Sequence, residues 1–244
     1  IGEIGPGDNF GVGLMMLANG ASEYHAIDRF RSNRDAAQQK QIYDALVDRH
    51  DLSHLFDGEP SEETIRNFRY HAGEPAETFF AHRQSQFDAI VSIAVLEHLY
   101  DPLHALNDMV AALHPGGVLI HRIDLRDHGM FSQYHHALTF LTIPATIYRR
   151  MTRNRGRPNR VLFPAYREWL QSSGLDGTLR VTRLLGTEGD VGPKDWADLD
   201  EPLKVRAISL VQRIRPRLRA VFSDYSDEDL SVCGCLLVVR KPRA

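Results

Sequence analysis

The stretch Ile1–Gly7 (Ile-Gly-Glu-Ile-Gly-Pro-Gly) has the pattern of a strand that runs directly into a glycine-rich turn. An amphipathic pattern follows at 9–20, so the turn joins a strand to a helix. Glycine lets the backbone approach a ligand closely, and the N-terminus of the following helix favours polar or anionic groups. A dinucleotide fingerprint needs Gly-x-Gly-x-x-Gly, but its third glycine position is Phe10 here. The turn therefore departs from the dinucleotide pattern.

Two carboxylates accompany the turn. Glu3 stands just before the glycines, where it suits a ligand with an ammonium group better than a pyrophosphate. Asp28 ends the next predicted strand, at 24–27, where a carboxylate can accept both hydroxyls of a ribose. Without Asp28 the glycines would fit an ordinary loop turn equally well. The combination favours a ligand that contains a nucleoside.

Strand-like and helix-like runs alternate over the first half of the chain, which indicates βαβ units and a parallel sheet. We expect one domain over residues 1–244 that is truncated at its N-terminus, with a possible substrate-covering insertion at 126–178. Further strands are predicted at 68–72, 87–93, 118–125, 179–184 and 231–240, and further helices at 32–49, 164–173 and 203–214, with a turn at 114–117.

Three further stretches complete a set of four motifs. They are Ala76–Glu77, then Phe87–Ser92 running into Val95–His98, and finally Leu113–Gly117. In order and spacing, the four motifs resemble those of class I S-adenosylmethionine-dependent methyltransferases, and they cover residues 1 to about 125. The resemblance implies an α/β, Rossmann-like fold. Its mostly parallel sheet would have seven strands, the last one antiparallel, with helices on both faces.

The resemblance also implies S-adenosylmethionine as the cofactor and assigns roles in binding it. The turn and its flanks would hold the methionine end, Asp28 the ribose, and the segments after the second and third strands the adenine. Pro75 departs from the family pattern, because many members have an acidic residue there. The cofactor-binding residues implied are Glu3, Gly5, Pro6, Gly7, Asp28, Arg29, Phe30, Ala76, Glu77, Ile93 and Ala94.

Acceptor chemistry is expected near the carboxyl ends of the fourth and fifth strands, where ligands of open α/β sheets sit. His128 follows the fifth strand and is the predicted general base, oriented by Asp124 or Asp127. The alternative is that Asp124 pairs with Arg122 or Arg126 and His128 only caps the loop. These catalytic residues favour oxygen as the methylated atom.

No metal is predicted from the sequence. Quinone-biosynthesis members of the family have a Glu-x-x-Glu-His run that is associated with a metal, but its first carboxylate position is Ala94 here. Glu97 and His98 are therefore interpreted as residues that start a helix. Tyr134 and the adjacent His135 and His136 fall in a predicted lid, and neighbouring histidines on a helix point in different directions.

An apolar run at 137–148 leads into an arginine-rich segment. The apolar run followed by arginines predicts either a helix that covers the substrate, or contact with a lipid-linked acceptor or a membrane surface. Aromatic residues for base stacking are missing from 149–160, so nucleic-acid binding is not clearly indicated. The arginines are Arg149, Arg150, Arg153, Arg155, Arg157 and Arg160.

Composition narrows the class of protein. The 244 residues are 43% hydrophobic and 25% charged, with a net charge of −3, which is ordinary globular chemistry and argues against a dedicated nucleic-acid binder. No apolar run reaches the length of a membrane span. Cys233 and Cys235 cannot form a disulfide scaffold, which favours a cytoplasmic location.

We expect methyl transfer to a small-molecule or glycan acceptor. The alternatives are a nucleic-acid or protein methyltransferase and an inactive interaction module.

Overall fold

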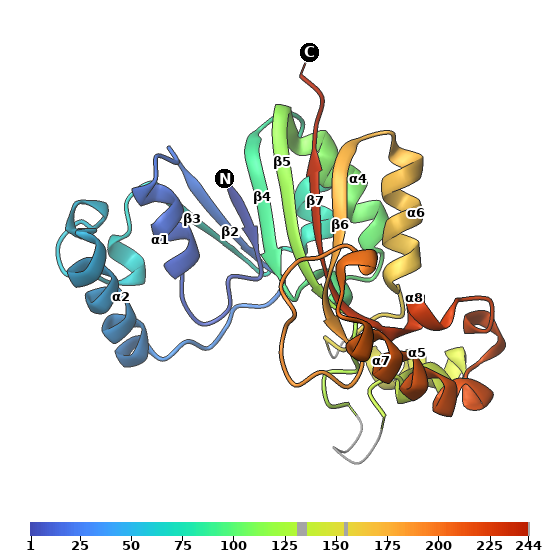
Figure 1. The fold of residues 1–244 in the computed structure, drawn as a ribbon. Coiled ribbons are helices and arrows are strands. Elements are labelled where there is room, and N and C mark those ends of the chain that lie inside the picture. The colour runs from blue at the N-terminus through green and yellow to red at the C-terminus, as the bar shows by residue number, and fades with distance from the viewer. Residues whose placement is uncertain (131–135, 154–155, 244) are drawn as a thin grey trace. The chain divides into compact units, whose positions relative to one another are not determined.

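A computed structural model describes residues 1–130, 136–153 and 156–243 (Figure 1). Its strands form one seven-stranded sheet in the order β3-β2-β1-β4-β5-β7-β6. The chain divides into two compact units, the first built from 1–93, 105–118 and Arg243, and the second from 94–104 and 119–242. β5 (Leu113–Asp124) contributes residues to both units.

The first unit is a parallel sheet covered by helices. β1 pairs in parallel with both β2 and β4, and β2 pairs in parallel with β3. α2 begins where the Asp35 side chain accepts hydrogen bonds from Ala37 N and Gln38 N, at 2.9 and 3.2 Å. The elements are β1 (Gly2–Ile4), α1 (Gly11–Ala18), β2 (Tyr24–Asp28), α2 (Ala36–His50), β3 (Phe68–Ala72), α3 (Ala76–Ala81), β4 (Phe87–Ile93) and most of α4 (Pro102–Ala112), with the short 3₁₀ turns η1 (Ser53–Leu55) and η2 (Glu62–Thr64).

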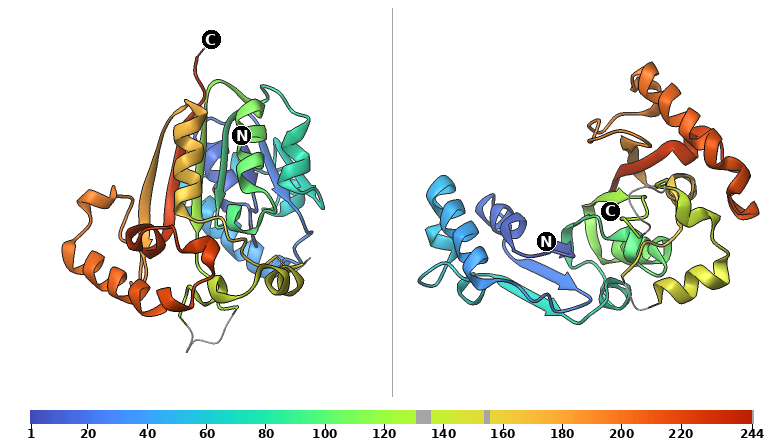
Figure 2. Two further views of the ribbon diagram at one scale, coloured as in Figure 1. Left: turned by 90° about the vertical axis from the view of Figure 1, so that its right-hand side faces the viewer. Right: turned by 90° about the horizontal axis from the view of Figure 1, so that it is seen from below.

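The second unit contains an antiparallel pair, β6 with β7, whose register runs from Asp176 opposite Arg240 to Leu184 opposite Val232. α6 lies alongside these strands (Figure 2) and ends at Gly174, which has the left-handed backbone (φ +66°) that favours glycine. The elements are η3 (Leu96–His98), η4 (Thr139–Thr142), α5 (Ala145–Thr152), α6 (Phe163–Ser173), β6 (Asp176–Leu184), η5 (Trp196–Asp198), α7 (Glu201–Ile214), η6 (Arg215–Arg217), η7 (Ala220–Phe222), α8 (Asp227–Ser231) and β7 (Val232–Arg240).

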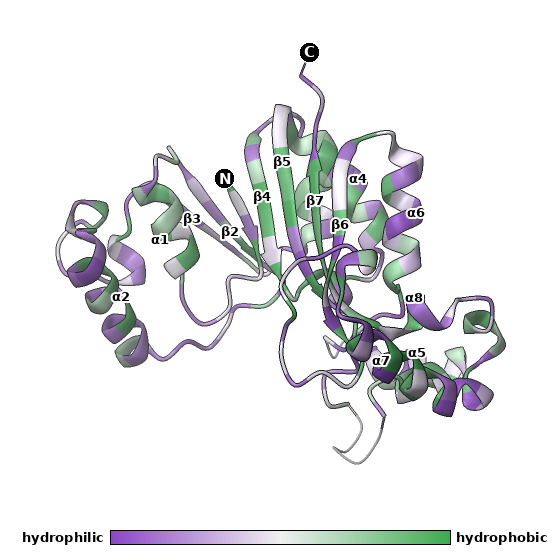
Figure 3. Cartoon of the chain, viewed as in Figure 1, coloured by the Kyte–Doolittle hydropathy of each residue, from purple (hydrophilic) through white to green (hydrophobic). Residues whose placement is uncertain are grey.

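The predicted fold class is confirmed. β4 and the middle of β5 are largely hydrophobic (Figure 3), as expected of strands inside a sheet. The start of β5 differs most from its predicted position, because the strand begins at Leu113 and includes the predicted turn at 114–117. Gly116 has the positive φ of a turn residue (+81°), yet the strand continues through it. The single domain and the substrate-covering insertion stay predictions; the structure places η4, α5 and α6 within 126–178.

Gly13 sets the distance between α1 and β2. A Cβ built on Gly13 would lie 2.0 Å from the Tyr24 ring, far inside van der Waals contact. Tyr24 itself is fully buried in a core with Phe10, Leu14 and Tyr43. In dinucleotide-binding folds, the third glycine of the fingerprint allows the helix to pack closely against the strand. Gly13 has the same packing role here, although it lies three residues after the position of that third glycine, which is Phe10.

We predict that Gly13→Ala lowers the free energy of unfolding by about 1–3 kcal/mol, because the added methyl group overpacks the contact with Tyr24. Urea denaturation measures the change. Gly189→Ala is the matched control, since a Cβ there meets nothing within 4 Å. Equal stability of the two variants would show that α1 does not depend on this close approach.

Candidate functional site

The glycine turn after β1 is held by backbone conformation. Gly5 and Gly7 have φ of +64° and +73°, in the region that favours glycine. Gly5 N–H donates to the Ile27 carbonyl at 2.8 Å, which fixes the turn, including Pro6, to the end of β2. A Cβ built on Gly7 would meet nothing within 4 Å, so this glycine borders open space. The turn can therefore present its backbone to a ligand.

The Glu3 carboxylate lies behind the turn and is only 6% exposed. Tyr24 Oη–H donates to Glu3 Oε2 at 2.5 Å. Burial raises the pKa of Glu3, while this hydrogen bond acts to lower it. The carboxylate is thus fixed in place, and an ammonium group bound beside it would offset the cost of its burial.

Arg34 links the turn to Asp28. Its Nε–H donates to the Gly7 carbonyl at 2.9 Å, and its Nη2 lies 3.8 Å from Asp28 Oδ2. The guanidinium also stacks over the rings of Phe10 and Tyr70, at 4.4 Å from each centroid. Arg34 therefore orients both predicted ligand-binding features, which the sequence did not indicate because it lies in a polar loop.

The remaining predicted cofactor residues lie at the ends of neighbouring strands. Arg29 and Phe30 directly follow β2, with the guanidinium 5.8 Å from the centroid of the Phe30 ring, which is 59% exposed. Ala76 and Glu77 form the first turn of α3. Ile93 ends β4 and is also largely exposed. The structure gives Ala94 a positive φ (+55°), which is unusual for a residue with a Cβ.

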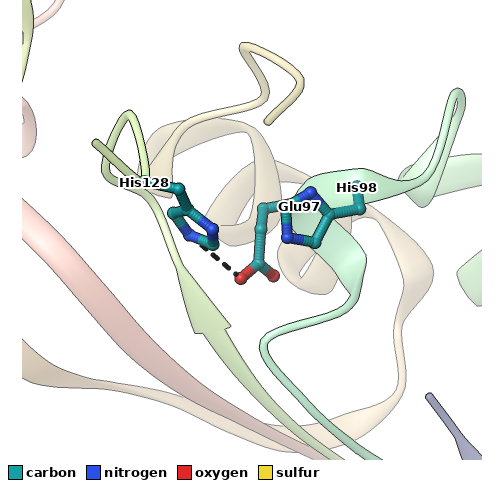
Figure 4. Close-up of side chains that lie close together, drawn as sticks. All are labelled: Glu97, His98 and His128. Atoms are coloured by element: carbon teal, nitrogen blue, oxygen red, sulfur yellow. Dashed lines mark ion pairs between the residues drawn. The ribbon is translucent and has the colours of Figure 1, made fainter. Parts of the chain in front are cut away.

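A second group of side chains gathers within the second unit. Glu97, His98 and His128, here called the Glu97 cluster, each offer a ligand atom, and these atoms lie within 4.8 Å of one another (Figure 4). His128 Nε2 is 3.5 Å from Glu97 Oε1. The two imidazole rings meet edge to face, with centroids 4.8 Å apart. His128 has a left-handed backbone (φ +51°), which turns its ring toward Glu97.

Asn159 holds the turn that carries Glu97 and His98. Its Nδ2–H₂ donates to the carbonyls of Leu96 and Leu99 at 2.9 and 3.0 Å, and its backbone N–H donates to the Glu97 carbonyl at 2.5 Å. The Leu96 carbonyl also accepts the Leu99 N–H at 3.2 Å, so Asn159 adds to the hydrogen bonding of η3 and of the residue that follows it. A sequence pattern does not reveal this contact because the partners are about 60 residues apart.

The Glu97 carboxylate is an unusual buried acid. It is 1% exposed, and burial raises its pKa to about 8. Oε1 accepts the Asp124 N–H at 3.3 Å, but Oε2 has no hydrogen-bond partner among the described residues. His98 Nδ1 is likewise buried without such a partner there. Burial, and then the charge of His128, lower the pKa of His98.

Of the predicted catalytic pair, His128 belongs to this cluster and Asp124 lies beside it. Asp124 Oδ2 is 3.6 Å from His128 Nε2, but the same carboxylate accepts two hydrogen bonds from the Arg126 guanidinium, at 2.8 and 2.5 Å, and one from the Arg126 backbone N–H at 3.1 Å. Burial acts to raise the pKa of Asp124, and Arg126 outweighs it, so the net pKa is lowered. Asp127 instead accepts the Gly129 N–H. The pairing with Arg126 that the sequence left open is therefore present, and Glu97 is a further carboxylate in reach of His128.

The apolar run before the arginines contributes largely to the core. Phe140, Leu141 and Tyr148 are buried, and the Arg160 guanidinium lies over the Tyr148 ring at 3.6 Å while donating to the Phe140 carbonyl. Tyr134, His135 and Arg155 lie outside the described residues. Exposed arginines of this segment are Arg149, Arg150, Arg153 and Arg157.

No helix in the described ranges combines the length and apolar character that crossing a membrane requires.

A parallel sheet with a glycine turn after its first strand and a carboxylate after its second defines a nucleotide-binding α/β class of protein. The family model described as a methyltransferase domain matches residues 3–178. The chain therefore belongs to this methyltransferase family. The predicted class, an S-adenosylmethionine-dependent methyltransferase, and its cofactor are confirmed.

Solved structures with a similar fold include the YcgJ protein from Bacillus subtilis. It is 11% identical with a TM-score of 0.47, and the match covers 100% of this chain and 92% of YcgJ. A SAM-dependent methyltransferase from Archaeoglobus fulgidus is 10% identical with a TM-score of 0.46, at 98% and 85% coverage. Phosphoethanolamine N-methyltransferase 2 from Haemonchus contortus is 15% identical with a TM-score of 0.46, at 99% and 48% coverage. None of the curated proteins matches the chain.

We predict that Asn159→Ala lowers the free energy of unfolding by about 2 kcal/mol, because it removes the side-chain donor to the partly buried Leu99 carbonyl and one of the two donors to the Leu96 carbonyl. Thermal or urea denaturation measures the loss. Asn19→Ala is the matched control, since the Asn19 amide also donates to a backbone carbonyl but is exposed. Similar losses in the two variants would contradict the special role of Asn159.

We predict that Glu3→Gln flattens the pH dependence of stability. A carboxyl group whose pKa is raised in the folded state destabilises the fold as pH rises from its unfolded value of about 4.5 through the folded pKa. The glutamine amide does not ionise, and its oxygen can still accept the hydrogen bond from the Tyr24 hydroxyl. Melting temperatures from pH 4 to 8 check this, and a wild-type profile as flat as that of the variant would contradict it.

Proposed function

We propose that this methyltransferase acts on a hydroxyl oxygen of a small-molecule or glycan acceptor. The observation that carries the choice of oxygen is the imidazole of His128 beside the carboxylates of Glu97 and Asp124. A hydroxyl needs a group that takes its proton during the attack, and a histidine near a carboxylate is well suited to that task.

The reaction is a direct displacement. The acceptor oxygen attacks the methyl carbon of S-adenosylmethionine, the bond between carbon and sulfur breaks, and the sulfur keeps the electron pair as the sulfonium charge is lost. The hydroxyl proton passes to His128, and the products are a methyl ether and S-adenosylhomocysteine. Much of the rate of such a step comes from holding the reactants in line.

The proposed cofactor contacts follow from the residues at the strand ends. Glu3 and the turn Gly5–Gly7 hold the methionine end, and Asp28 accepts the ribose hydroxyls. Arg29 and Phe30 flank the adenine ring, and the backbone of Ala76–Glu77 contacts the adenine edge. Ile93 and Ala94 line the methionine portion. The fixed position of Asp28 and Gly7, both bound to Arg34, supports these roles.

The segment around Ile147 bears on the nature of the acceptor, and the two cysteines bear on the location of the protein. A lipid-linked acceptor or peripheral membrane contact would use the exposed Ile147 and its neighbours Arg149 and Arg150. The burial of Phe140 and Tyr148 favours a covering segment instead. The free, buried thiols of Cys233 and Cys235 agree with a reducing, cytoplasmic location.

We predict that Asp28→Ala weakens the binding of S-adenosylmethionine at least about tenfold, or about 1.4 kcal/mol, because the ribose loses its carboxylate acceptor. Isothermal titration calorimetry measures the change. Asp44→Ala is the control, since Asp44 is an exposed carboxylate on α2 that pairs with Lys40. Unchanged affinity in Asp28→Ala would contradict the proposed site. Cofactor binding without transfer to any hydroxyl compound would favour an inactive interaction module.

A further inference from the structure

We propose that Glu97, His98 and His128 bind a divalent transition-metal ion of the zinc type. The proposal starts from buried polar atoms that the protein leaves without hydrogen bonds. Among the described residues, Glu97 Oε2, His98 Nδ1 and His128 Nε2 are all buried and lack a hydrogen-bond partner. Such atoms normally find a partner, because each unsatisfied one costs free energy.

The three residues belong to one cluster rather than to scattered sites. One ligand atom from each residue lies within 4.8 Å of the others. Ligands around one zinc ion are about 2.0–2.2 Å from it and so at most roughly 4.2 Å apart. Small side-chain rotations are therefore enough to close the set around an ion. Figure 4 shows the three side chains turned toward one another.

An ion pair between Glu97 and protonated His128 does not account for the arrangement. Their contact, at 3.5 Å, is made by Glu97 Oε1, which also accepts the Asp124 N–H. It leaves Glu97 Oε2 and His98 Nδ1 unsatisfied. A cation would satisfy all three side chains at once and would offset the burial of a carboxylate that is 1% exposed.

The donor set selects the kind of ion. Imidazole nitrogen suits zinc and its neighbours, whereas magnesium and calcium prefer oxygen ligands only. Two histidines and one glutamate also form a known catalytic zinc set, which leaves a fourth position for water or substrate. Asp124 lies 3.6 Å from His128 Nε2 but is engaged by Arg126, so we place it as a supporting carboxylate and not as a ligand.

The backbone at the cluster is shaped to bring the ligands together. Ala94, before η3, and His128, after β5, both have the left-handed φ that L-residues rarely adopt. Asn159 fixes the turn that carries Glu97 and His98. Strained residues of this kind persist where the surrounding structure holds them, and they concentrate at functional sites.

The ion would alter the proposed proton transfer, and this part of the inference rests on the proposed function. Glu97, His98 and His128 would hold the ion, so in the metal-bound protein His128 would be a ligand and not the base. The positive charge would lower the pKa of an acceptor hydroxyl at the open position, so that its proton could pass to water instead of to His128. The methyl ether and S-adenosylhomocysteine would be the products in either case. The substrate class is then a hydroxyl compound able to reach a metal.

Binding of Zn²⁺ tests the inference directly. The chain is freed of metal with a chelator, dialysed and titrated with Zn²⁺ by calorimetry, alongside the variants Glu97→Gln and His98→Ala. We expect one high-affinity site, weakened in each variant by more than the roughly 10- to 100-fold that loss of a merely supporting partner costs. His82→Ala is the matched control, because His82 is exposed at the end of α3 and outside the cluster.

X-ray absorption of the Zn²⁺-loaded wild type gives a readout that does not depend on how well the variants fold. We expect nitrogen and oxygen ligands at about 2.0–2.2 Å, with the scattering pattern of two imidazoles. Equal Zn²⁺ affinity in all variants, or a spectrum without imidazole, would overturn the inference.

A titration of the same samples with S-adenosylmethionine separates this inference from the proposed function. Cofactor binding without the zinc site defeats only the metal. A zinc site in a chain that does not bind the cofactor defeats the proposed function instead.

Discussion

The burial of the Glu97 carboxylate is the constraint on which the second unit depends. A carboxylate removed from water costs several kcal/mol unless charges or hydrogen bonds replace its hydration. Here the protein supplies one backbone N–H, from Asp124, and the ring of His128 at 3.5 Å. The positive φ of Ala94 costs free energy in the same neighbourhood, while the hydrogen bonds of Asn159 stabilise the turn that carries the acid. Such an arrangement is expected at a functional site.

In the first unit, side chains hold the glycine turn after β1 in one backbone conformation. Arg34 does so from a loop, by bonding the Gly7 carbonyl while stacking over Phe10 and Tyr70. The same guanidinium lies 3.8 Å from Asp28, so it links the turn to the carboxylate at the end of β2. Gly13 allows α1 to pack close to Tyr24, and Tyr24 in turn fixes Glu3. The core residues of this unit and the residues proposed to contact the cofactor are therefore one connected set.

The sequence was sufficient for the fold because its signals are local. Glycine turns, caps such as Gly174 and runs such as Phe87–Ile93 each specify their own element, and their order identifies the family. The predicted cofactor-binding residues come from the same motifs, and they stay predictions. The Glu97 cluster did not, because its members come from η3 and from the loop after β5, and the contact depends on backbone angles that no pattern encodes. Arg34 and Asn159 were missed for the same reason, since each acts over a long sequence separation.

Asp28 and the glycine turn are the residues proposed to hold S-adenosylmethionine for methyl transfer. A crystal structure with S-adenosylhomocysteine bound tests this most directly. We expect the ribose hydroxyls within hydrogen-bond distance of the Asp28 carboxylate, about 2.5–3.0 Å, and the methionine end against Gly5–Gly7. A cofactor whose ribose lies away from Asp28, or one bound on another part of the chain, would contradict it.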